Sequence, residues 1–197
     1  MRVAIVGGTG DFGLALARRL VEAGDDVVIG SRDPERAQEN AREIRCAGLG
    51  NEEAVAGADL VVLATKANAA LETAAALAGS IGEAPVLSVA SDLRSTEAQS
   101  IAERVQELLS APVVAGLHSL AAGKLAHGRP AEDAFVCGDA ADAKALALEL
   151  AAKVVAGRAL DAGPLFSARA LEGLTAVIVN LNKRYKGHAG IRVTGLP

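Results

Sequence analysis

The chain opens on Met1-Arg-Val-Ala-Ile-Val-Gly-Gly-Thr-Gly-Asp-Phe-Gly13, and this stretch decides its fold. Residues 2–6 predict a short buried strand, and residues 12–23 predict a helix. The turn between them carries the dinucleotide-binding pattern of three spaced glycines. The first glycine allows a tight turn, the second lets the backbone approach a pyrophosphate, and the third lets the helix pack close to the strand. The helix N-terminus adds free N–H groups for the phosphates. We therefore predict a phosphate-binding turn formed by Gly8, Thr9, Gly10, Asp11, Phe12 and Gly13.

The end of the second strand, Val27-Val-Ile-Gly-Ser31-Arg32, indicates which dinucleotide binds. NAD sites usually place an acidic residue about 20 residues after the glycine pattern, to bind the ribose 2′-hydroxyl. Here a hydroxyl and a guanidinium stand there, and both suit a 2′-phosphate. Arg36 lies four residues on, on the helical face of Arg32, whereas Asp33-Pro34 is typical of a helix N-cap. NADP(H) is favoured over NAD(H); the alternative is that both arginines are solvated surface charges.

Composition excludes several classes of function. The 197 residues carry a net charge of −4, and only 2% are aromatic against 51% hydrophobic, so the core is built from Ala, Val, Leu and Ile. A nucleic-acid-binding protein would need a basic stripe, and no apolar run reaches the length of a membrane span. Because the first strand is expected at residues 2–6, we expect no signal peptide. The histidines lack metal-ligand spacing, and Cys46 and Cys137 form no CxxC motif. We expect a cytoplasmic protein without nucleic-acid, membrane or metal partners.

Strand and helix signals alternate as far as about Leu117. Further strands are expected at residues 46–49, 59–65, 85–89 and 112–117, and further helices at residues 34–45, 51–56 (capped by Asn51), 68–80 and 95–109 (beginning at Ser95). This alternation is typical of an α/β protein with a parallel sheet. We therefore predict a Rossmann-type doubly wound parallel sheet, with residues 1–117 as the NADP-binding domain.

Residues 118–197 predict a small C-terminal α/β subdomain that contributes the acceptor pocket. Strands are expected at residues 135–138 and 158–161, and helices at residues 140–155 and 171–185. The last helix carries an apolar stripe that we expect to be buried, as a wall of the acceptor pocket and at or near a homodimer interface. The stripe consists of Leu171, Leu174, Val177, Ile178 and Leu181.

With these segments in view, the chain resembles the NADPH-dependent F420 reductases over nearly its whole length. The resemblance rests on residues 2–13, on Gly30-Ser31-Arg32, on Gly116-Leu-His-Ser-Leu-Ala-Ala-Gly-Lys-Leu-Ala126, and on Val136-Cys-Gly-Asp139 followed by Leu160-Asp-Ala-Gly-Pro164, Leu171-Glu172, Leu174-Thr175 and Asn180. It implies a Rossmann domain and an oxidoreductase that transfers a hydride between NADP(H) and the deazaflavin coenzyme F420.

The remaining site residues are expected at the carboxyl ends of strands, where ligands bind in such sheets. His118 is the candidate catalytic residue: an imidazole of ordinary pKa, near 6.5, that stabilises charge on the reduced ring. The alternative is a structural histidine. The backbone of Ser119, Leu120 and Ala121 would hydrogen-bond a cofactor ring, and Thr65 and Lys66 would also contact a cofactor.

Two segments depart from the family pattern: the loop after the fifth strand, residues 90–96, is shorter than is usual in the family, and the segment after the fourth strand differs in its residues. Many members carry a Pro-aromatic pair after the fourth strand, where this chain has Thr65-Lys66-Ala67-Asn68. Two other functions therefore stay open: an NADPH-dependent reductase of a flavin or other small acceptor, and a non-catalytic NADP(H)-binding sensor.

Overall fold

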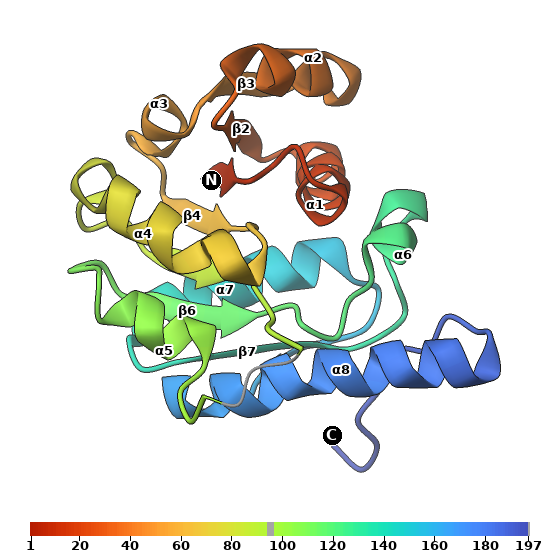
Figure 1. The fold of residues 1–197 in the computed structure, drawn as a ribbon. Coiled ribbons are helices and arrows are strands. Elements are labelled where there is room, and N and C mark those ends of the chain that lie inside the picture. Colours follow the sequence, from red (N-terminus) through yellow and green to blue (C-terminus); the bar gives the residue numbers. More distant parts are fainter. Residues whose placement is uncertain (94–96, 197) are drawn as a thin grey trace.

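The computed structural model describes residues 1–93 and 97–196. One eight-stranded sheet has the order β3-β2-β1-β4-β5-β6-β7-β8, and every neighbouring pair is parallel except β6 and β7 (Figure 1). This confirms the predicted doubly wound sheet. The strands are β1 (Arg2–Val6), β2 (Asp26–Ser31), β3 (Ala47–Gly50), β4 (Leu60–Leu63), β5 (Val86–Ser88), β6 (Val113–Gly116), β7 (Ala134–Gly138) and β8 (Ala159–Asp161).

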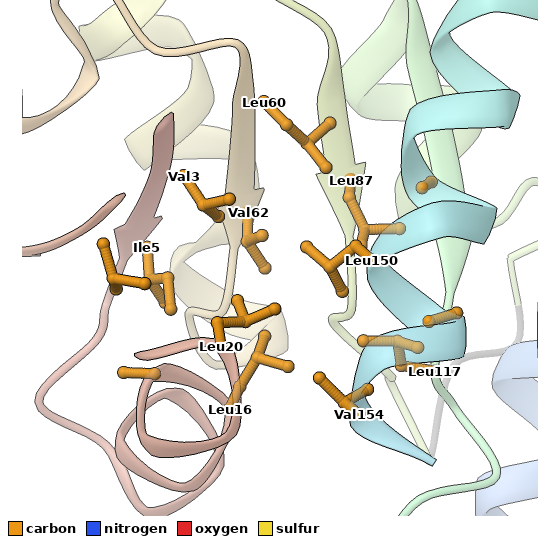
Figure 2. Close-up of a cluster of buried hydrophobic side chains, with 14 of the residues drawn as sticks. Val3, Ile5, Leu16, Leu20, Leu60, Val62, Leu87, Leu117, Leu150 and Val154 are labelled. Carbon is orange, nitrogen blue, oxygen red and sulfur yellow. The ribbon is translucent and has the colours of Figure 1, made fainter. Parts of the chain in front are cut away.

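The two faces of the sheet bury separate apolar cores, because successive side chains of a strand point to opposite faces. In Figure 2, Val3 and Ile5 pack toward α1, and Leu150 of α7 lies in the same core. Ala4 and Val6 belong to the opposite core, with residues of α4, α5 and α8. The helices are α1 (Asp11–Glu22), α2 (Pro34–Ile44), α3 (Asn51–Val55), α4 (Ala67–Ile81), α5 (Ile101–Gln106), α6 (Ala122–His127), α7 (Ala141–Val154) and α8 (Ala168–Tyr185), with the short 3₁₀ turn η1 (Leu165–Ser167). Within the described ranges, no helix has the length and apolarity to cross a membrane.

Helix α5 begins later than the sequence predicts. The expected start, Ser95, lies outside the described residues, and the helix begins at Ile101. Ser100 forms a capping box with Glu103: the Ser100 hydroxyl accepts from the Glu103 backbone N–H at 3.0 Å, and the Glu103 carboxylate accepts from the Ser100 N–H at 2.7 Å. Glu172 of α8 accepts a further hydrogen bond from the Ile101 N–H at 2.8 Å. These caps fix the start of the helix.

Other boundaries also differ. Gly50, not Asn51, is the N-cap of α3, so Asn51 lies in the first turn. Helix α8 begins at Ala168 rather than at Leu171. Helix α6, which has only six residues, was not predicted from the sequence.

Strands β7 and β8 extend the same sheet, since Ala115 of β6 pairs with Cys137 of β7. The expected domain boundary at residue 117 therefore falls just after β6. The assignment of residues 118–197 as a subdomain that serves the acceptor stays a prediction.

Candidate functional site

The turn after β1 is shaped by glycines, but the conformational freedom is needed one residue earlier than expected. Gly7 has φ +76°, a left-handed conformation that favours glycine. Gly8 and Gly13 are required for close packing instead. A Cβ on Gly8 would lie 2.7 Å from the Cγ2 atom of Ile29, and a Cβ on Gly13 would lie 2.7 Å from the Cα atom of Gly8. The tight turn therefore belongs to Gly7, whereas Gly8 packs closely against Ile29 of the neighbouring strand β2.

Gly10 is open, unlike Gly8 and Gly13. It is the N-cap of α1, and a Cβ on it would meet nothing nearer than the Gly7 carbonyl oxygen at 3.5 Å. Gly10 lines a cleft of about 670 Å³ at the carboxyl ends of β1, β2 and β4. The strand order reverses between β1 and β4, the usual place for a ligand in such sheets. The cleft brings together seven predicted residues: Thr9, Gly10, Ser31, Arg32, Arg36, Thr65 and Lys66.

The arginine end of the cleft is organised by an N-cap. The Asp33 carboxylate accepts from the Arg36 backbone N–H at 3.1 Å, as the Asp33-Pro34 pair predicts. The Ser31 hydroxyl accepts from the Asp33 N–H at 3.1 Å. The Asp33 carboxylate is thus occupied as the cap of α2. The cationic groups at this end of the cleft are Arg32 and Arg36. Both are exposed, and within residues 1–93 and 97–196 neither forms an ion pair.

A second hollow of about 320 Å³ adjoins this cleft at the carboxyl ends of β4, β5 and β6. Gly10, Thr65 and Lys66 line both spaces. We call the smaller space the acceptor pocket. Its other lining residues include Asp11, Phe12, Leu117, His118, Leu120 and Thr175.

His118 is buried, with 5% of its surface exposed. Burial lowers its pKa to about 4, although the hydrogen bond with the Ala90 carbonyl opposes this shift. The expectation of an ordinary pKa near 6.5 is therefore wrong, and the imidazole is neutral at physiological pH. Its Nε2 atom lies 3.2 Å from the Ala90 carbonyl oxygen. A neutral ring in this position donates through Nε2, which leaves Nδ1 as an acceptor.

Helix α8 contributes a residue that the sequence analysis did not place in the site. The Thr175 hydroxyl donates to the His118 carbonyl oxygen at 3.0 Å and lies 3.0 Å from the Ser91 hydroxyl. Thr175 thus connects the segments after β5 and β6. The available signal was a hydroxyl between the apolar residues Leu174 and Ala176, within the Leu174-Thr175 pair.

Two of the residues predicted after His118 have local structural roles. The Ser119 hydroxyl donates to the Asp133 carbonyl oxygen at 2.8 Å and is buried. Ala121 is the N-cap of α6. Of the three residues that follow His118, Leu120 is the one that lines the acceptor pocket.

The apolar stripe on α8 is only partly buried within the chain, and the expected burial of its remaining residues at a homodimer interface stays a prediction. Leu171 and Ile178 are buried, whereas Val177 is 51% and Leu181 39% exposed. The residue of α8 that lines the acceptor pocket is Thr175, and no member of the stripe does so.

The buried polar atoms Thr65 Oγ1 and His118 Nδ1 belong to residues that line the two spaces, and both lack a hydrogen-bond partner within the described residues. Buried polar groups are normally satisfied, so their position beside the cleft and the acceptor pocket indicates an elongated polar ligand. Arg32 and Arg36 at one end of the cleft favour an anionic group of such a ligand at that end. A dinucleotide fits this arrangement.

Comparisons with known proteins identify relatives along the whole chain. A family described as "NADP oxidoreductase coenzyme F420-dependent" matches residues 2–92. The F420-dependent NADP reductase of Methanothermobacter thermautotrophicus is 34% identical, over 100% of this chain and 96% of that protein. The enzyme of the same name from Methanocaldococcus jannaschii is 31% identical, over 100% and 99%. The crystal structure of a candidate F420-dependent NADP reductase from Arthrobacter sp. FB24 superimposes with a TM-score of 0.84 at 26% identity, over 95% of this chain and 96% of that one.

Proposed function

The chain belongs to the family of F420-dependent NADP reductases, and from this premise we propose that it transfers a hydride between NADP(H) and coenzyme F420. The observation that carries the proposal is the 34% identity to an F420-dependent NADP reductase along the whole chain. The cleft and the acceptor pocket support it, because they adjoin at Gly10, Thr65 and Lys66. Two adjoining spaces are what a reaction between two cofactors requires.

The cleft suits NADP(H). We assign the 2′-phosphate to Ser31, Arg32 and Arg36, since a guanidinium gives charge-assisted hydrogen bonds to phosphate oxygens. The pyrophosphate belongs at the turn formed by Gly7 to Gly10, where the N-terminus of α1 favours an anion. Thr65 and Lys66 would then lie near the nicotinamide end, because they line both spaces.

The acceptor pocket suits a neutral, hydrogen-bonding ring. The two cofactors supply the hydride chemistry themselves. The chain therefore has to hold the two rings together and keep water away. Neutral His118 offers its Nδ1 atom as an acceptor for a ring or carboxamide N–H, while Ala90 and Thr175 hold the residue in place. His118 is thus a positioning and binding group, not a source of positive charge.

Assembly and compartment form a second part of the proposal. The exposed apolar residues of α8, Val177 and Leu181, continue along the helix to Tyr185, which is 73% exposed. Apolar patches on a surface favour contacts with a partner, and a second copy of the chain is the commonest such partner. We therefore propose a homodimer that uses this face. The two cysteines are free thiols, which suits a cytoplasmic protein.

Mixing the purified protein with NADPH and oxidised F420, and following the visible absorbance of F420, tests the function. We expect the absorbance to disappear with NADPH, and far more slowly with NADH. Parallel reactions with FMN and FAD measure the flavin alternative. Binding of NADPH without turnover of any acceptor would indicate a sensor and overturn the proposal.

A further inference from the structure

Asn51 stands at the arginine end of the cleft, although nothing in the sequence marked it as a ligand-binding residue. In the parallel pair of β2 and β3, Ser31 pairs with Gly50. The residues that follow this pair, Arg32 after β2 and Asn51 after β3, are therefore neighbours at the end of the two strands. Neighbouring strands lie about 5 Å apart, so the two residues leave the sheet side by side. Asn51, Ser31 and Arg32 all line both the cleft and an adjoining hollow of about 440 Å³.

The side chain of Asn51 is held against the backbone of β2. A Cβ on Gly30 would lie 2.9 Å from Asn51 Oδ1 and 3.1 Å from the Cβ atom of Ala54. The absence of a side chain at Gly30 therefore makes room for the Asn51 amide. The Oδ1 atom is enclosed there and has no hydrogen-bond partner within the described residues. With Oδ1 on the inner side, the Nδ2 group is the end of the amide that faces the cleft.

An amide N–H pair at this point complements the groups around it. Ser31 offers a hydroxyl, and Arg32 and Arg36 offer guanidinium groups. The adjoining hollow is also lined by Arg32, but it adds three carboxylates, those of Glu52, Glu53 and Glu72, of which Glu72 lines the cleft as well. Because Glu52 and Glu53 line only the hollow and Arg36 lines only the cleft, we expect a phosphate on the cleft side, where the Asn51 amide is a neutral donor.

We propose that Asn51 is a specificity-determining residue for the ribose 2′-phosphate, to which its Nδ2 group donates a hydrogen bond beside Ser31 and Arg32. This inference rests on the proposed use of NADP(H). It adds a phosphate-binding residue at the start of α3 to Ser31 and Arg32 at the end of β2. It also gives Gly30 a role, because the glycine admits the amide to this position.

Calorimetry with 2′,5′-ADP and 5′-AMP tests the inference, because these two probes differ only in the 2′-phosphate. Asn51→Asp replaces the donor by an anion of the same size. We expect 2′,5′-ADP to bind at least about 10-fold more weakly, as for the loss of a hydrogen bond to a charged group. Affinity for 5′-AMP should stay almost unchanged. Asn51→Ala removes the donor without adding charge and should shift the same preference in the same direction, by less.

Gln38→Glu is the matched control. Gln38 is an exposed residue of α2 that lines neither space, and its substitution changes the net charge by the same amount. It should leave both affinities close to those of the wild type. Circular dichroism checks that each variant is folded. If Asn51→Asp does not fold, Asn51→Ala decides the question alone.

Two outcomes would overturn the inference: equal losses for both probes, or wild-type affinity for 2′,5′-ADP in the folded Asn51 variants. Failure of the proposed function has a different signature. In that case the wild-type protein itself would show no preference for 2′,5′-ADP over 5′-AMP, or no reaction with F420.

Discussion

The Nε2 atom of His118 lies 3.2 Å from the carbonyl oxygen of Ala90. This contact joins the segment after β6 to the segment after β5 at the base of the acceptor pocket. It also determines which ring nitrogen is free, because Nε2 donates and Nδ1 is left as an acceptor. The site therefore presents a neutral imidazole to the acceptor.

A pH-dependent loss of stability follows from His118. Burial lowers its pKa in the folded protein to about 4, from 6.5 in the unfolded chain. Between these values the unfolded chain binds the proton and the folded chain does not, so stability falls as the pH drops from about 6.5 to about 4. The full effect is on the order of 3 kcal/mol.

Urea unfolding at pH 7 and pH 4.5 measures this effect. We expect the free energy of unfolding to fall less between these pH values in His118→Gln than in the wild type. His188→Gln, which changes an exposed histidine, should behave like the wild type. An identical pH dependence in wild type and His118→Gln would show that His118 is not buried in its neutral form.

Arg32→Ala should change the choice of dinucleotide. Loss of a charge-assisted contact with the 2′-phosphate typically costs about 1.5–3 kcal/mol, or roughly 10- to 100-fold in affinity. We expect that loss for NADPH and little change for NADH. Arg42→Ala, an exposed residue of α2 that lines neither space, is the control. Equal losses for the two dinucleotides would mean that Arg32 does not contact the phosphate.

The glycines of the turn should separate binding from folding. Gly10→Val places its side chain in open space, so the protein should fold but lose NADPH binding through collision with the pyrophosphate. Gly13→Val should instead destabilise the fold, because its Cβ would lie 2.7 Å from the Cα atom of Gly8. Thermal unfolding and calorimetry measure the two effects. Full NADPH affinity in folded Gly10→Val would contradict the placement of the phosphates.

Val177→Glu tests the proposed homodimer. Val177 is 51% exposed in the single chain, so the substitution should not disturb folding but should place a charge in the interface. We expect a lower mass in solution by light scattering, with NADPH binding retained. Ala47→Glu, at the exposed edge strand β3, adds the same charge far from α8 in the sheet order and should keep the wild-type mass. A Val177→Glu protein of wild-type mass that binds NADPH and F420 would show that this face of α8 is not the homodimer interface.

Features that depend on neighbouring residues were determined by the sequence alone. The apolar run of β1 and the Asp33-Pro34 cap each depend on a few neighbouring residues and are present as predicted, whereas the tight turn between β1 and α1 belongs to Gly7 rather than to Gly8. The alternation of strands and helices likewise predicted the doubly wound sheet. Ser31 and Arg32 are consecutive residues at the end of β2, so their preference for NADP(H) over NAD(H) could also be predicted from the sequence.

Tertiary structure decided the features that join distant segments. The low pKa of His118 arises from its burial, which outweighs the opposite effect of the hydrogen bond with the Ala90 carbonyl, 28 residues away. Thr175 entered the site because α8 packs back onto the segment after β6. Asn51 reached the cleft because β3 pairs with β2 and Gly30 leaves room for its amide. Periodicity assigned the α8 stripe to a helix, but only packing showed that Leu171 and Ile178 are buried while Val177 and Leu181 are exposed. A sequence pattern reports local geometry, whereas burial and electrostatics depend on what the rest of the chain places nearby.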